Sequence, residues 1–146
     1  MSIRAINLTK TTDHVLSFDD AAGTDDATTF TIGALDSRVF SVIKDKATAL
    51  PVSAFSNPEG AMASLNMNQT NFEIVVFGLK GWKNFRDDQD KQVAYKTVHT
   101  QLGGRTYITI DPELVALLPE EAITELANKI MDFNVPSEED RKNSEE

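Results

Sequence analysis

Residues 68–88 hold the strongest apolar run in the chain together with its only tryptophan. They read Asn68-Gln-Thr-Asn-Phe-Glu-Ile-Val-Val-Phe-Gly-Leu-Lys-Gly-Trp-Lys-Asn-Phe-Arg-Asp-Asp88. Four apolar side chains in this stretch share the i, i+3, i+4 and i+7 spacing of one helix face: Phe72, Val75, Val76 and Leu79. The spacing predicts a central buried helix near residues 70–81, and it is a packing signal rather than a chemical one.

The polar residues before this run and the glycine after it indicate where the helix begins and ends. The side chain of Thr70 or Asn71 can accept a hydrogen bond from a free backbone N–H group at the helix start. Gly81 can adopt the left-handed conformation that commonly ends a helix. Residues 48–68 are rich in Ala, Ser and Pro, which favours a long loop, although residues 62–67 can instead extend the helix toward the N-terminus.

Two pairs of apolar and β-branched segments predict two antiparallel hairpins. Residues 15–18 and 28–32 can pair across the acidic loop between them. Residues 93–98 and 105–110 can pair through Gly103-Gly104, which is a compact turn signal.

Helix start signals mark the segments on either side of these hairpins. Asp36 is an N-cap for a helix over residues 37–47, whose basic residues fall near its C-terminal end. Asp111 and Pro112 open a helix pair over residues 112–133. In the second helix of this pair, four residues form an apolar stripe: Ile123, Leu126, Ala127 and Ile130.

These segments together predict a single α+β domain over residues 1–136, with short antiparallel β segments packed with a central helix and a C-terminal helix pair. At 146 residues the chain is long enough for one sizeable core. Residues 3–8 would form either a first strand or an ordered arm. Residues 137–146 are charged and lack apolar side chains, which predicts a solvated tail.

The composition limits the classes of partner that the chain fits. The chain has 14 basic and 23 acidic residues, for a formal net charge of -9. Nucleic-acid binding takes most of its affinity from Lys and Arg that neutralise phosphates, so we expect no nucleic-acid partner. No apolar run approaches the roughly 18 residues of a membrane span, and the N-terminus lacks the apolar core of a signal peptide, so we expect no membrane partner and synthesis inside the cell. The absence of cysteine excludes disulfides and thiolate metal sites.

No motif for catalysis or ligand binding is visible in the sequence. The two histidines, His14 and His99, are too far apart for a metal or triad motif, and we expect each to be exposed or hydrogen-bonded within a strand. Residues 88–92 lack the glycine and the closing glutamate of a calcium loop. The paired aspartates at 19–20 and 25–26 are typical of solvated turns. We therefore expect no catalytic, cofactor-binding or metal-binding residue, and a non-enzymatic function.

Three aromatic residues are candidates for contact with a partner protein: Trp82, Phe85 and Tyr95. Core packing is the favoured interpretation for Trp82. Phe85 lies between Asn84 and Arg86 in a polar turn, which makes it the better candidate for a contact. The acidic C-terminal tail either binds a basic partner or keeps the protein dispersed, and the second interpretation is favoured.

Several stretches follow one another in a characteristic order. Phe-Gly-Leu-Lys-Gly-Trp-Lys-Asn-Phe-Arg-Asp at 77–87 precedes the acid-started helix pair at 111–130 and the Glu-rich tail at 137–144. Before them, Thr29-Phe-Thr-Ile-Gly-Ala-Leu35 leads into a helix. This order resembles the small tail-assembly chaperones of tailed phages, and the resemblance covers roughly residues 28–144.

The resemblance implies a phage morphogenesis protein that acts by protein–protein contact without a cofactor. A tail-assembly chaperone would cover apolar surface on the tape-measure or tail-tube protein in the host cytoplasm, and it would leave before the particle is complete. One alternative is a structural protein of the head, for capsid decoration or head–tail joining, which would stay in the virion and contact the capsid. A second alternative is a small acidic inhibitor of a host nucleic-acid-binding protein. All three are compatible with a homo-oligomer.

Overall fold

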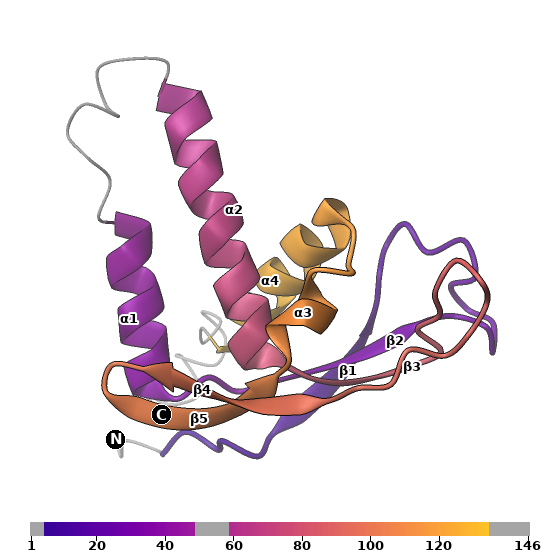
Figure 1. Ribbon diagram of the computed structural model, residues 1–146, viewed down its shortest axis with the longest axis horizontal. Coiled ribbons are helices and arrows are strands. Elements are labelled where there is room, and N and C mark those ends of the chain that lie inside the picture. Colours follow the sequence, from indigo (N-terminus) through magenta and orange to yellow (C-terminus); the bar gives the residue numbers. More distant parts are fainter. Residues whose placement is uncertain (1–4, 49–58, 135–146) are drawn as a thin grey trace, which may run out of the picture.

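The protein has an α+β fold, the class that the sequence predicts (Figure 1). The computed structural model describes the backbone of residues 5–48 and 59–134, and the side chains of residues 5–45 and 69–134. In chain order the elements are β1 (Thr11–Val15), β2 (Thr29–Gly33), α1 (Ser37–Thr48), α2 (Glu59–Gly78), β3 (Leu79–Lys83), β4 (Thr97–Leu102), β5 (Arg105–Ile110), α3 (Pro112–Val115) and α4 (Glu120–Asn134). The strands lie along one side of the molecule and the helices on the other, with α1 beside α2 (Figure 1).

β1, β2 and β3 form an antiparallel sheet with β2 in the middle. In β2 the side chains of Phe30 and Ile32 are buried, and those of Thr29 and Thr31 are half-buried on the opposite face. Successive side chains of a strand point to opposite faces, so this alternation places one face of the sheet in the core. α4 packs against β2 and against α2 on that side.

The hairpin that the sequence predicts on either side of the acidic loop exists, but its first strand is shifted. β1 pairs with β2 through Thr11–Val15, so the prediction of residues 15–18 as the first strand is wrong. The strand ends there because Asp19 N donates to the carbonyl of Leu16 at 3.1 Å, which closes a turn. Residues 5–8 of the N-terminal arm contain no strand.

The central helix begins earlier and ends earlier than the sequence predicts. α2 starts at residue 59, so the extension through residues 62–67 is confirmed for the backbone, and the loop prediction is wrong from residue 59 onward. Thr70 and Asn71 are buried inside the helix and do not cap its start. The remaining loop residues, 49–58, lie outside the described ranges.

α2 passes directly into β3, so Leu79 and Gly81 belong to a strand and not to the predicted helix face and stop. Two side chains hold this junction. Lys80 Nζ donates to the carbonyl of Phe77 at 2.8 Å, and the Tyr95 hydroxyl donates to the carbonyl of Leu79 at 2.8 Å. The first bond satisfies one of the carbonyls that a helix end leaves without a partner.

β4 and β5 form a separate two-stranded antiparallel ribbon, which is the second predicted hairpin. Gly103 and Gly104 both have positive φ, 59° and 78°, as a tight two-residue turn requires. β4 begins at Thr97 and not at residue 93 as predicted. The carbonyl of Val93 is occupied by the indole N–H of Trp82, at 2.7 Å, outside the strand ladder.

The predicted helix starts are confirmed by their capping bonds. Asp36 Oδ1 accepts from Arg38 N at 2.7 Å ahead of α1, and Asp111 Oδ1 accepts from Glu113 N at 3.0 Å ahead of α3. The stripe on α4 faces the core, where three of its four residues are fully buried: Leu126, Ala127 and Ile130. The predicted charged tail, residues 137–146, lies outside the described ranges.

Candidate functional site

The three aromatic residues singled out from the sequence lie together beside the sheet. The ring centroid of Trp82 is 4.8 Å from that of Phe85 and 5.4 Å from that of Tyr95, and Phe30 of the core packs on the same group. All three rings are half-buried. Trp82 lies in β3. Burial raises the pKa of Tyr95 to about 12. Their role in contacting a partner stays a prediction.

A cluster that the sequence did not reveal joins β1 to α4. Glu125 Oε2 lies 2.6 Å from His14 Nε2 and accepts from Ser17 N at 2.8 Å, while the Ser17 hydroxyl donates to Glu125 Oε1. Burial raises the pKa of Glu125, but the bonds from Ser17 and His14 outweigh it and lower this pKa overall. In a catalytic triad the histidine stands between the serine and the acid. Here the carboxylate stands in the middle, an arrangement that ties the strand to the helix.

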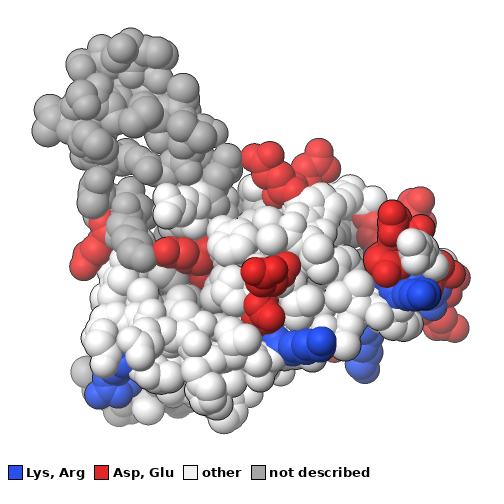
Figure 2. Space-filling view, viewed as in Figure 1, with Lys and Arg blue, Asp and Glu red and all other residues white. Residues whose placement is uncertain are grey.

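Asp19 holds the turn that follows β1. Asp19 accepts from Ala21 N at 2.9 Å and from Thr28 N at 3.0 Å, which is the solvated-turn role expected from the sequence. Within residues 5–45 and 69–134, no group of three His, Cys, Asp or Glu side chains is placed to hold a metal ion. Acidic side chains gather at the end of the molecule where the β1–β2 and β3–β4 loops meet (Figure 2).

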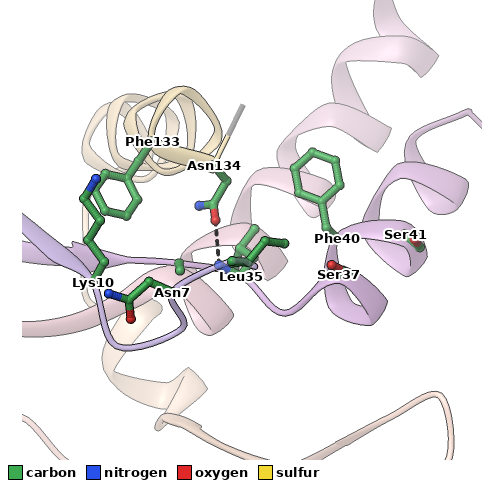
Figure 3. Close-up of a pocket in the computed structure, with 10 residues that line it drawn as sticks. Asn7, Lys10, Leu35, Ser37, Phe40, Ser41, Phe133 and Asn134 are labelled. Atoms are coloured by element: carbon green, nitrogen blue, oxygen red, sulfur yellow. Dashed lines mark hydrogen bonds between the residues drawn. The ribbon is translucent and has the colours of Figure 1, made fainter. Parts of the chain in front are cut away.

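A hollow of about 310 Å³ lies where the N-terminal arm, the start of α1 and the end of α4 meet, and we call it the arm hollow (Figure 3). Phe40 of α1 and Phe133 of α4 stand on either side of Asn134 in it (Figure 3). Lysines lie over both rings, with Lys10 Nζ 5.8 Å from the centroid of Phe133 and Lys44 Nζ 5.5 Å from that of Phe40. The hollow is therefore mainly apolar inside, and its lining includes the basic side chain of Lys10.

Asn134 is fixed in this hollow by hydrogen bonds to three partners. Its Oδ1 accepts from Leu35 N at 2.6 Å, and its Nδ2 donates to the carbonyls of Gly33 at 3.2 Å and Ile130 at 2.7 Å. The carboxamide thus caps the end of α4 and binds the β2–α1 connection at once. Because its polar atoms are already engaged, the hollow offers a partner mainly apolar contact.

Exposed apolar side chains surround the arm hollow and a smaller neighbour. The second hollow, about 160 Å³, shares Ala34 and Leu35 with the first. Ile6 lines the arm hollow and is 56% exposed, while Leu8 and Ile108 line the second and are 52% and 68% exposed. We call Ile6, Leu8 and Ile108, with the two hollows, the arm surface.

Sequence reasoning missed the arm surface because its parts come from five separate segments. The one local signal was the apolar pair Ile6 and Leu8, in a segment interpreted as either a strand or an arm.

Among the described helices, none is long and apolar enough to cross a membrane. Compared with protein-family models, curated proteins and solved structures, the chain matches none of them.

Proposed function

We propose that this chain is a non-enzymatic morphogenesis protein of a tailed phage, and specifically a tail-assembly chaperone that holds an apolar segment of a tape-measure or tail-tube protein. Two things support the proposal. One is the resemblance of residues 77–87 and 111–130 to such chaperones. The other is the arm surface, which is the observation that carries it.

The arm surface has the properties of a protein-binding patch. Contiguous exposed apolar residues are uncommon on monomeric soluble proteins, and they mark interaction sites more often than isolated exposed residues do. Ile6, Leu8 and Ile108 are each more than half exposed, and the two hollows between them share a wall. Lys10, which lines the arm hollow, favours an apolar segment that carries an acidic residue beside it.

The test is co-purification of the full chain with the tape-measure and tail-tube proteins of the same phage. We expect a complex with one of them that is lost in Ile6→Lys and kept in the matched control Ala5→Lys. Both substitutions add the same charge to exposed neighbouring positions, but only Ile6 lines the arm hollow. Equal binding by both variants would show that the arm surface is not the site.

Mass spectrometry of purified particles separates the chaperone from the structural alternative. A chaperone leaves during assembly in the host cytoplasm and is absent from the virion. A capsid decoration or head–tail joining protein is present in a fixed copy number, and that result would replace the chaperone proposal. Binding to a host nucleic-acid-binding protein that weakens with salt and competes with DNA would instead favour the inhibitor class.

A further inference from the structure

The outer edge of β4 pairs with no other strand in the described part of the chain. Leu102 and Arg105 flank the tight turn and form a hydrogen-bonded pair. Along an antiparallel pair of strands, hydrogen-bonded residues alternate with residues whose backbone N–H and C=O groups point away from the partner strand. This alternation places the N–H and C=O groups of Thr97, His99 and Gln101 on the outer edge of β4. Such an edge can add another strand through main-chain hydrogen bonds.

This edge lacks the features that usually protect an exposed strand. Lysine and other charged side chains, proline and bulges are the common devices against unwanted pairing. β4 and β5 contain one charged residue, Arg105, no proline, and an unbroken register. The surface over the ribbon is mostly uncharged in a chain of net charge -9 (Figure 2). An edge left open in this way is compatible with a strand that covers it in use.

A hollow of about 570 Å³ runs beside the same edge, between β4 and α2, and we call it the β4 groove. Its apolar lining comes from Phe72, Val76 and Phe77 of α2 and from Leu102 of β4. Its polar lining includes Thr100 and Gln101 of β4 and Gln69 and Glu73 of α2. Side chains of a strand alternate between two faces, so a strand added to β4 would direct every second side chain toward α2.

We infer that β4 and the β4 groove bind an extended segment of a partner protein as a third strand of the ribbon, with apolar side chains at alternate positions. Main-chain bonds to the outward groups of β4 hold the segment, and Phe72, Val76 and Leu102 receive its apolar side chains. Basic or neutral flanks suit it better than acidic ones, because the whole chain has a formal net charge of -9. Phe77 lines both the β4 groove and the second hollow, but Gln101 lines only the groove and Ile6 only the arm hollow, so substitutions at Gln101 and Ile6 test the two proposals independently.

An extended segment fits this site better than a second copy of the chain does. If two β4 strands paired about a two-fold axis, each would already have its inward side chains, such as Thr100 and Leu102, at its own groove. Neither copy would then supply side chains to fill the groove of the other. Two copies of net charge -9 also repel each other.

A peptide library displayed on a carrier, selected against the full chain, tests the period of the bound segment. We expect enriched peptides with apolar residues at alternate positions, and strand-type amide protection of His99 and Gln101 when such a peptide binds. Peptides with a helical apolar spacing, or no enrichment, would overturn the inference.

Two further comparisons test whether the backbone of β4 makes the contact. A selected peptide that is N-methylated on its β4-facing amides should bind the unaltered protein at least tenfold more weakly than the parent peptide, and equal binding would overturn the inference.

Gln101→Pro removes an outward backbone N–H from β4. Thr106 is the cross-strand partner of Gln101, and Thr106→Pro removes the outward backbone N–H from the other edge of the ribbon, on β5. We expect at least a tenfold loss for Gln101→Pro only, and a loss confined to Thr106→Pro would contradict it.

Discussion

Two of the elements beside α2, namely α4 and β4, fill the space next to it very differently. Where α2 meets α4, Ile130 is fully buried, and a Cβ placed on Gly78 would lie 2.5 Å from the Cγ2 atom of Ile130. Where α2 faces β4, a hollow of about 570 Å³ lies between the two elements, lined by Phe72 and Leu102. One side of the helix is therefore closed by side chains and another is open.

The difference separates the part of the chain that stabilises the fold from the part that is available to a partner. Protein interiors pack at the density of organic crystals, so the close contact at Gly78 is what a stable body requires. The β4 groove instead opens at the outer edge of β4, and Val76 and Phe77 of the core form part of its lining. Substitutions where α2 meets α4 should therefore change the free energy of unfolding, and substitutions at the β4 groove should change partner binding.

On the closed side of α2, where it meets α4, the largest loss of stability is expected from Gly78→Ala. An added methyl group would lie 2.5, 2.8 and 3.0 Å from three side-chain carbons of Ile130, which is buried and branched and cannot move aside. Alanine favours a helix over glycine by about 1 kcal/mol, but overpacking of a core costs about 1–3 kcal/mol, and three contacts of 3.0 Å or less put this site at the upper end of that range. We expect a net loss of about 2 kcal/mol in the free energy of unfolding, measured by urea denaturation.

Gly81→Ala is the matched control for this prediction. A Cβ on Gly81 would meet Thr31 at 3.8 Å, an ordinary contact, so we expect a change within about 0.5 kcal/mol. If the two alanine variants were equally stable, the close packing of α2 on α4 would not be what requires glycine at residue 78.

Asn134→Ala should cost slightly less, because it removes hydrogen bonds and not packing. The substitution leaves the amide of Leu35, a buried residue, without the partner that lies 2.6 Å away. A buried donor left unsatisfied costs about 1–3 kcal/mol, and we expect about 1.5 kcal/mol. Urea denaturation measures the loss in free energy of unfolding. The control is Asn128→Ala, at an exposed position on the same helix, which should change this free energy little. A neutral Asn134→Ala would mean that the carboxamide does not hold the β2–α1 connection.

The sequence predicted the helix starts, which depend on neighbouring residues, and missed the contacts between elements that are distant in the chain. Capping residues such as Asp36 and Asp111 act within two residues, so their pattern is readable in one segment. The end of α2 is not readable in this way, because Lys80 and Tyr95 fix it through contacts that only the fold creates. The need for glycine at residue 78 is not readable either, because it comes from the side chain of Ile130, far along the chain.

The candidate surfaces were harder still to predict, for the same reason. The arm surface and the β4 groove join segments that are distant in sequence, and neither contains a motif. The cluster of His14, Ser17 and Glu125 likewise forms across the fold, so histidine spacing gave no sign of it. The aromatic residues were visible as candidates because tryptophan is single in this chain.

The acid stability of the chain should depend on Asp36, at the rim of the hollow next to Ile108. The side-chain bond from Arg38, followed by the bond from its backbone N–H, lowers the pKa of Asp36 from 3.8 to about 2. A folded pKa below the unfolded value stabilises the fold above pH 3.8, and this contribution disappears as the pH falls toward 2. Because Arg38 is 54% exposed, solvent screening limits the effect to about 1 kcal/mol.

Asp36→Asn isolates this charge, since asparagine caps a helix about as well as aspartate does. We expect the variant to lose less stability than the unaltered chain between pH 4 and pH 2, measured as the urea midpoint at each pH. Parallel curves for the two proteins would show that the Arg38 pair does not contribute in the folded state.

The smallest change is expected from Ile108→Thr, in the ribbon that forms the open side. Ile108 is 68% exposed, and threonine keeps the β-branched shape that suits a strand, so the free energy of unfolding should change by less than about 0.5 kcal/mol. Ile110→Thr, two residues further along the same strand, places a hydroxyl group at a fully buried position and should cost about 2–3 kcal/mol. Urea denaturation of both variants compares them within one element. A large loss for Ile108→Thr would mean that this side chain belongs to the core and not to the arm surface. A small loss would leave the side chain of Ile108 free of any role in stabilising the fold, as the proposed arm surface requires.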